Sequence, residues 1–129
     1  MDVGAEGSNL VFMVGQSHPS ELTRDTSHAV IACIALDKDL VRQAEHKFTN
    51  RNYTGATAIR RLRPSSNEFA MGVFKHIVIL DYANMAFREL MIFENVHTDV
   101  VDDIAVFGSH LFSVTRKDRY INHISILNF

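Results

Sequence analysis

The sequence predicts a single α+β domain over residues 1–129, with one or two N-terminal strands, one main helix and a four-stranded antiparallel meander packed against that helix. Three observations support this fold class. The chain of 129 residues can bury a core, and its hydrophobic fraction of 47% and charged fraction of 22% are those of an ordinary globular protein. Residues 38–49 carry an apolar stripe with helical spacing. From residue 72 onward, extended apolar runs follow one another across short gaps.

Two strands are expected before the helix. Residues 9–15 (NLVFMVG) form a short apolar run with β-branched and aromatic members that ends at a glycine. Residues 28–37 (HAVIACIALD) are almost continuously apolar, which is typical of a strand covered on both faces. The polar segment 16–27 contains a proline and is expected to be a loop. Cys33 is the only cysteine, so an internal disulfide is excluded, and its apolar neighbours predict a buried thiol.

The main helix is expected over residues 38–49, where Asp37 is a suitable N-cap. The apolar stripe of this helix consists of Leu40, Val41, Ala44 and Phe48. A second short helix is expected over residues 56–64, because apolar residues recur there at every third position and Pro64 would end it.

The C-terminal half is expected to contain only strands. The four strand candidates are residues 72–82, 87–96, 103–115 and 120–129. The gaps between them are short, which favours hairpins over crossover helices and therefore predicts antiparallel pairing.

Two of these strands contain nearly the same pentapeptide, HIVIL at residues 76–80 and HISIL at residues 123–127. The pair resembles the 2H phosphoesterase family, whose members carry two His-x-Thr/Ser motifs on facing strands. The resemblance implies a phosphodiesterase acting on cyclic or 2′-5′ RNA phosphates, with His76 and His123 as general acid and base and Ser125 as a phosphate contact. Val78 stands where the first motif requires a hydroxyl, and the family has a helix where hairpins are expected here.

The preferred interpretation is that both histidines are structural strand residues with hydrogen-bond partners. His123 alternates with Ile121, Leu127 and Phe129, and this alternation predicts that its face of the strand is buried. A buried imidazole could not reach a substrate, so no catalytic residue is assigned.

A cluster of potential metal ligands lies in the segment ENVHTDVVDD. His97 and Asp99 are the metal candidates, and Asp102, Asp103 and His110 follow them. The same residue types are common in solvated turns between strands. A turn is the preferred interpretation, and neither a metal nor a cofactor is expected.

Charge is distributed unevenly along the chain. Residues 42–63 contain six basic residues against one acidic residue, whereas residues 89–103 contain five acidic residues and no Lys or Arg. The candidate basic patch consists of Arg51, Arg60, Arg61 and Arg63. Such a patch could contact a phosphate backbone, but a solvated face is favoured and any nucleic-acid binding is expected to be weak. Opposite charges on one small domain also suit contacts between copies.

The sequence therefore favours a non-enzymatic binding or assembly module that acts through protein–protein contacts, including self-association. The strand that ends at Phe129 is suited to edge pairing. With a net charge of −2, acidic residues near the N-terminus and no apolar run of membrane-spanning length, the chain is expected to be soluble, intracellular and cytoplasmic, with no membrane partner.

Overall fold

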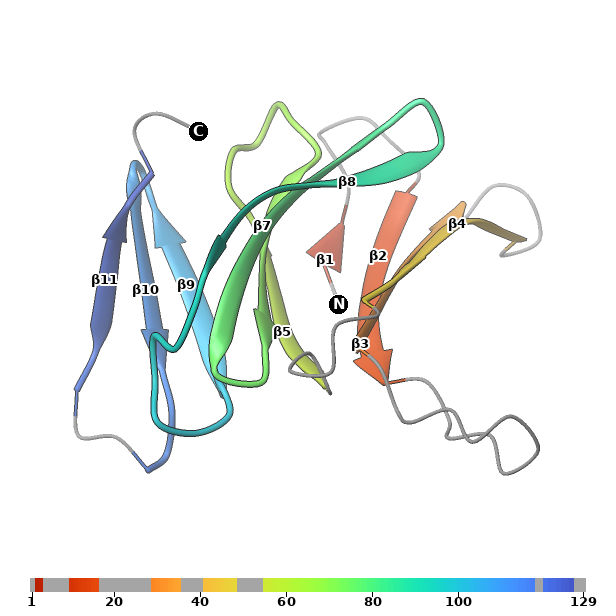
Figure 1. Cartoon of the computed structure of the whole chain (residues 1–129). Helices are drawn as coiled ribbons and strands as arrows, with labels where there is room; N and C mark the ends of the chain where they lie inside the picture. The colour runs from red at the N-terminus through yellow and green to blue at the C-terminus, as the bar shows by residue number, and fades with distance from the viewer. Residues whose placement is uncertain are drawn as a thin grey trace, which may run out of the picture.

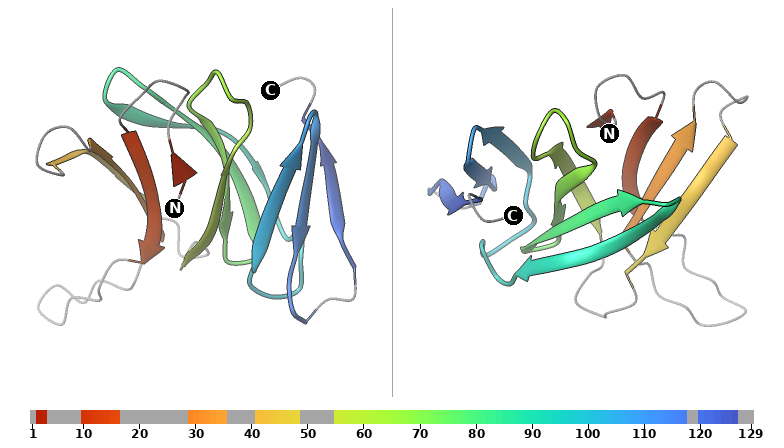
Figure 2. Two further views of the ribbon diagram at one scale, coloured as in Figure 1. Left: turned by 180° about the vertical axis from the view of Figure 1, so that it is seen from behind. Right: turned by 90° about the horizontal axis from the view of Figure 1, so that it is seen from above.

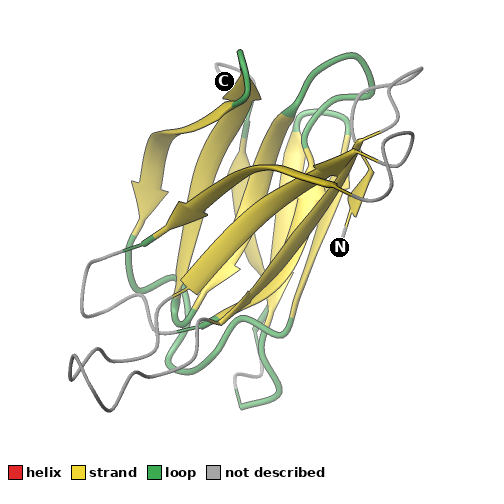
Figure 3. Cartoon of the chain, turned by 90° about the vertical axis from the view of Figure 1, so that its right-hand side faces the viewer, coloured by secondary structure: helices red, strands yellow, loops and turns green. Residues whose placement is uncertain are grey.

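The computed structural model describes residues 2–3, 10–16, 29–35, 41–48, 55–117 and 120–126. Over these ranges the chain consists of strands and turns and contains no helix (Figure 3). The strands are β1 (Asp2–Val3), β2 (Leu10–Gln16), β3 (Ala29–Ala35), β4 (Val41–Lys47), β5 (Ala56–Arg61), β6 (Glu68–Val73), β7 (His76–Ala83), β8 (Ala86–Phe93), β9 (Asp103–Phe107), β10 (His110–Val114) and β11 (Asn122–Ser125). In this part of the chain no helix is long and apolar enough to cross a bilayer.

The strands form three antiparallel sheets in which neighbours in the chain are neighbours in the sheet. The sheets are β1-β2-β3-β4, β5-β6-β7-β8 and β9-β10-β11. They lie in this order across the molecule, with the β5–β8 sheet between the other two (Figures 1 and 2). The predicted antiparallel pairing is thus confirmed, but a single four-stranded meander is wrong, because β9–β11 form a separate layer.

The middle strands of the central sheet, β6 and β7, are buried on both faces because they are apolar at consecutive positions. On β6, Met71 and Ala70 are both fully buried and point to opposite sides. Met71 belongs to a core shared with Phe12 of β2 and with Phe48, which directly follows β4. Ala70 belongs to a second core, which includes Leu111 of the β9–β11 sheet. A run that is apolar on both faces therefore specifies a middle layer.

Two-residue turns join β6 to β7, β7 to β8 and β9 to β10. At the tip of β7–β8, Asn84 and Met85 have φ values of 54° and 60°, the sign that a type I′ hairpin requires at both positions. The β9–β10 turn begins with Gly108 at φ 58°. The predicted strands 72–82 and 103–115 were each too long, because turns at 74–75 and 108–109 divide them.

The chain passes from the central sheet to the third sheet through residues 94–102, which run against the β6–β7 turn. The backbone N–H of Val101 donates to the carbonyl of Phe74 at 2.8 Å. A Cβ on Gly72 would lie 3.0 Å from Cγ1 of Val101, so the missing side chain permits this close approach. Glycine at this position lets the connection pack directly on β6.

The predicted main helix over 38–49 is wrong, because residues 41–47 form β4. Ala44 and Phe48 are compatible with a helix and with a strand, because residues four apart lie on the same face of either element. Pairing with the long apolar strand β3 decides between the two, and Phe48 enters the core with 2% of its surface exposed. Asp37 and Leu40 lie outside the described residues.

The predicted second helix over 56–64 is also wrong, because residues 56–61 form β5. Ile59 and Ala58 are buried in different cores, so this strand needs apolar residues on both faces. Residues 10–16 and 29–35 are strands, close to the predicted 9–15 and 28–37. The predicted loop at 16–27 lies outside the described residues except for Gln16, which ends β2.

Candidate functional site

The β9–β11 sheet has one face against the central sheet and one face that points away from it. Ile104, Leu111 and Ile126 point inward and are at most 1% exposed. Because side chains alternate along a strand, the residues between them point outward. We call this outward surface the outer face; it consists of Asp103, Ala105, Phe107, His110, Phe112, Val114, Ile121, His123 and Ser125.

The outer face exposes large apolar side chains. Phe107 is 79% exposed, Ile121 is 68% exposed and Val114 is 37% exposed. Ala105, Phe112, Val114 and Ile121 line a shallow apolar hollow of about 320 Å³ together with Asp103 and Ile104. Single exposed apolar residues are ordinary, but a contiguous group on one sheet face is typical of a contact surface.

Two histidines stand next to this hollow. Nδ1 of His110 and Nε2 of His123 are 2.9 Å apart, so the two rings share one hydrogen bond. The His123 ring also stacks on Phe112, with centroids 5.1 Å apart and planes at 26°. This arrangement holds the three rings in a fixed cluster on the exposed side of the sheet.

The prediction that His123 has a hydrogen-bond partner is confirmed, but the prediction that its face is buried is wrong. His123 and Ile121 are exposed, whereas Ile124 is half-buried and Ile126 is buried in the second core. The side chains of this strand that point into the core are thus one position away from the predicted ones. The prediction failed because apolar residues occur on both faces of this strand. Leu127 and Phe129 lie outside the described residues.

His76 and His123 do not form one site. His76 is 6% exposed on β7, and its Nδ1 accepts a hydrogen bond from the backbone N–H of Asn95 at 3.0 Å. Its neighbours Ile77 and Ile79 face the β9–β11 sheet, so alternation directs His76 to the opposite side of the central sheet. His123 points away from that sheet on the outer face. The paired acid and base of the phosphoesterase resemblance are therefore not assembled, and Ser125 lies beside His110 instead.

The two metal candidates also point to different partners. His97 is 5% exposed, and its Nε2 lies 2.9 Å from Oγ of the fully buried Ser113. Asp99 instead accepts from the backbone N–H of Val100 and pairs with Lys117 at 3.1 Å. Among the described residues, no three His, Cys, Asp or Glu side chains come together in a way that could hold a metal ion. His97 thus ties the connection to β10, and no second metal-ligating side chain accompanies it.

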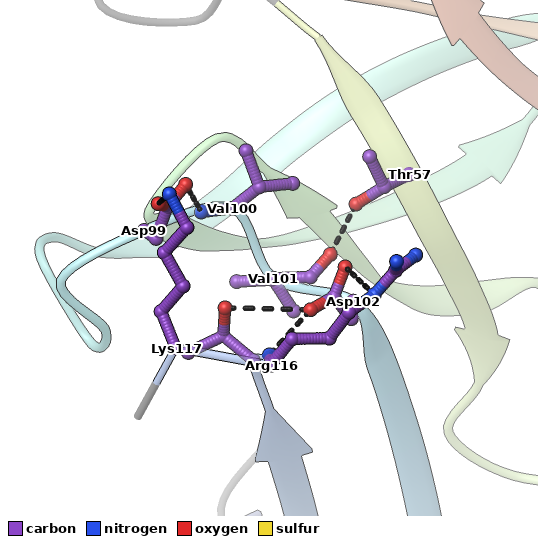
Figure 4. A network of polar contacts seen from close by, with 8 residues as sticks. Thr57, Asp99, Val100, Val101, Asp102, Arg116 and Lys117 are labelled. Atoms are coloured by element: carbon purple, nitrogen blue, oxygen red, sulfur yellow. Dashed lines mark hydrogen bonds and ion pairs between the residues drawn. The ribbon is translucent and has the colours of Figure 1, made fainter. Parts of the chain in front are cut away.

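The carboxylates of the same segment hold the connection in place (Figure 4). Asp102 accepts a hydrogen bond from the backbone N–H of Arg116 and lies 3.6 Å from that residue's Nε. Thr57 on β5 donates its hydroxyl to the carbonyl of Val101. The hydrogen bond from Val100 N–H, aided by Lys117, holds the pKa of Asp99 below its ordinary value. These acidic residues are structural partners of the strand ends.

The candidate basic patch is partly neutralised within the chain. Arg60 pairs with Asp103 at 3.2 Å, and Arg63 pairs with Glu68 at 2.7 Å. Arg63 also donates to the carbonyl of Ile126. Arg61 lines a separate hollow of about 450 Å³, and Arg51 lies outside the described residues. Two of the four arginines of the patch therefore have an acidic partner within the chain, and nucleic-acid binding stays a prediction.

A third hollow, of about 590 Å³, was not anticipated from the sequence, because three distant segments form it. Lys75 comes from the β6–β7 turn, Asn95 and Thr98 from the connection, Tyr120 from the chain before β11 and Asn122 from the start of β11. Asn122 donates its side-chain amide to the carbonyl of Val96 at 3.3 Å. The hollow thus lies where the connection is fixed to β11.

No protein-family model matches the chain, and no curated protein is similar to it in sequence.

The outer face offers exposed apolar and aromatic groups on a hydrogen-bonded backbone. Aromatic side chains and a shortage of unpaired charge are typical of the centres of protein interfaces. The single carboxylate at the hollow, Asp103, is already paired with Arg60.

Proposed function

We propose that this protein is a non-enzymatic binding module that contacts another polypeptide through the outer face of its β9–β11 sheet. The observation that carries the proposal is the exposure of Phe107, Val114 and Ile121 on one side of a single sheet. Full burial of such a side chain is worth about 1.5–3 kcal/mol, so three together could drive association once the entropic cost is met.

The rigidity of the face supports the same function. β10 pairs with β9 on one side and with β11 on the other, so the backbone under the hollow is hydrogen-bonded in both directions. The inner side of the same strands is anchored in the second core by Leu111 and Ile104. A partner would therefore meet a preorganised surface and would not have to order it.

Site-specific photo-cross-linking tests this proposal. A Val114→p-benzoylphenylalanine variant, irradiated in an extract of its native cells, is expected to give one or a few discrete adducts. The matched control carries the same group in place of Ala86, which is exposed at the start of β8, away from the outer face. Adding Phe107→Asp to the Val114 variant should abolish the adducts. Equal labelling from both positions, or none from position 114, would show that the outer face is not a binding surface.

A further inference from the structure

Two imidazole rings meet on the exposed side of the β9–β11 sheet. Nδ1 of His110 and Nε2 of His123 are 2.9 Å apart, and the strands that carry them, β10 and β11, are paired along their backbones. The other described histidines each meet a different kind of group: a carboxylate at His46, a backbone N–H at His76 and a hydroxyl at His97. The His110–His123 contact therefore joins two groups of the same chemistry, both of them exposed.

The hydrogen bond between the two rings holds one proton at their contact. A neutral imidazole has one N–H and one lone pair, and the proton can reside on either ring nitrogen. If the shared proton moves through solvent to the other nitrogen of its own ring, two lone pairs face each other and the net charge is unchanged. A divalent transition-metal ion can then occupy the place of that proton, because imidazole is a suitable ligand for zinc, copper and nickel.

The spacing of the two rings fits a tetrahedral metal ion. With metal–nitrogen bonds of about 2.0–2.1 Å, two imidazoles on such an ion have facing nitrogens about 3.3 Å apart and ring centroids about 5.2 Å apart. The centroids of His110 and His123 are 5.0 Å apart. The facing nitrogens have to separate by about 0.4 Å, which a tilt of the two exposed rings supplies. The paired backbones of β10 and β11 can therefore stay where they are.

We propose that His110 and His123 form a two-ligand site for a divalent transition-metal ion such as Zn²⁺. His110 binds the ion through Nδ1 and His123 binds it through Nε2. Because no third His, Cys, Asp or Glu side chain joins them within the described residues, water fills the remaining coordination positions. This site goes beyond the binding function proposed above, since it concerns an ion held by one chain alone.

Isothermal titration of the purified chain, made without a polyhistidine tag, with zinc chloride tests this site. We expect a dissociation constant of about 1–200 µM, since two ligands supply about half of the binding free energy of a four-ligand site. His110→Ala and His123→Ala should each weaken the affinity at least tenfold, because a single imidazole remains. His46→Ala is the matched control, because His46 lies on β4 of another sheet and its loss should leave the affinity unchanged. Circular dichroism establishes that each variant is folded.

NMR of the ring nitrogens identifies the ligating atoms in the wild type, without any substitution. Long-range ¹H–¹⁵N spectra should show Zn²⁺ on Nδ1 of His110 and on Nε2 of His123, with the other nitrogen of each ring protonated. Zinc on only one of these rings, or no change at either ring up to about 1 mM zinc, would overturn the site. An equal affinity in the wild type and both alanine variants would also overturn it. Such a failure would leave the binding function to be decided by the photo-cross-linking experiment.

Discussion

Nδ1 of His110 and Nε2 of His123 lie 2.9 Å apart across the β10–β11 pair, on the exposed side of the sheet. The two residues are diagonal in register, since His110 lies opposite Ser125 and His123 lies opposite Phe112. Diagonal neighbours on one face of an antiparallel pair can interact when their side chains are long or aromatic. The hydrogen bond therefore links the strand that ends the described chain to the middle of the sheet.

A double-mutant cycle should detect this link. We expect His110→Ala and His123→Ala each to lower the free energy of unfolding. The sum of these two losses should exceed the loss in the double variant by about 0.5–1.5 kcal/mol, the usual net value of one hydrogen bond. Urea unfolding supplies the measurement. The control cycle combines His110→Ala with His46→Ala; because His46 lies on β4 of another sheet, those losses should be additive within about 0.5 kcal/mol. Additivity in the first cycle would mean that the two rings do not stabilise each other.

Asp99 should make the stability of the protein depend on pH. Its pKa is lowered in the folded state, first by the hydrogen bond from Val100 N–H and then by Lys117. A lowered folded pKa means that the stabilisation is complete above the ordinary Asp pKa of about 4 and is lost as the pH falls through the folded value. In urea titrations, the difference in unfolding free energy between wild type and Asp99→Asn should be constant above about pH 5 and should shrink below about pH 4.

Lys117→Ala should reduce the pH-dependent part of that difference without removing it, because the backbone hydrogen bond from Val100 remains. A difference between wild type and Asp99→Asn that does not change between about pH 2 and pH 7 would contradict the lowered pKa.

Antiparallel pairing in the C-terminal half could be predicted because its signal is local. Short gaps separate the apolar runs, and the Asn84–Met85 turn falls in one of them. The turn at Gly108–Ser109 also had a local signal, since glycine in the first position of a two-residue loop is typical of a type II′ hairpin. It was missed because the apolar run on either side of it was treated as continuous.

The helix at 38–49 was predicted wrongly because an i, i+4 pair is compatible with both periods. The pairing of residues 41–47 with β3 distinguishes a strand from a helix here. Such a pairing between segments cannot be predicted from either segment alone. The same holds for the candidate site. His123 could be singled out from the sequence, but its partner His110 and the phase of the strand depend on register, and a shift of one residue exchanges the faces.

Gly72 should be intolerant of even one methyl group. An added Cβ would lie 3.0 Å from Cγ1 and 3.1 Å from Cβ of Val101, so Gly72→Ala is expected to lower the unfolding free energy by about 1–3 kcal/mol. The matched control is Gly15→Ala on β2, where an added Cβ would meet nothing within 4 Å and the loss should be small. Adding Val101→Ala to Gly72→Ala should recover part of the loss by removing the clashing methyl groups. An equal effect at the two glycines would mean that the connection does not pack closely on β6.

The phosphoesterase resemblance predicts an activity that the positions of His76 and His123 do not support. Acid–base catalysis on a phosphodiester needs both imidazoles within hydrogen-bonding reach of one substrate. His76 is 6% exposed and bonded to Asn95 N–H, whereas His123 lies on the outer face and is bonded to His110. We expect no hydrolysis of 2′,3′-cyclic nucleotides or 2′-5′ oligoadenylates by the wild-type protein.

His76→Ala and His123→Ala make this assay decisive. His76→Ala should lower the unfolding free energy, because it removes a buried side chain together with the acceptor for Asn95 N–H, and that loss is expected to be about 1–3 kcal/mol. His123→Ala should cost less, because its ring is exposed. If the wild type turned over either substrate and each substitution abolished that turnover while the protein stayed folded, the two strands would have to approach each other in solution. The proposal that the outer face is a non-enzymatic surface would then be wrong, because His123 would belong to a catalytic site.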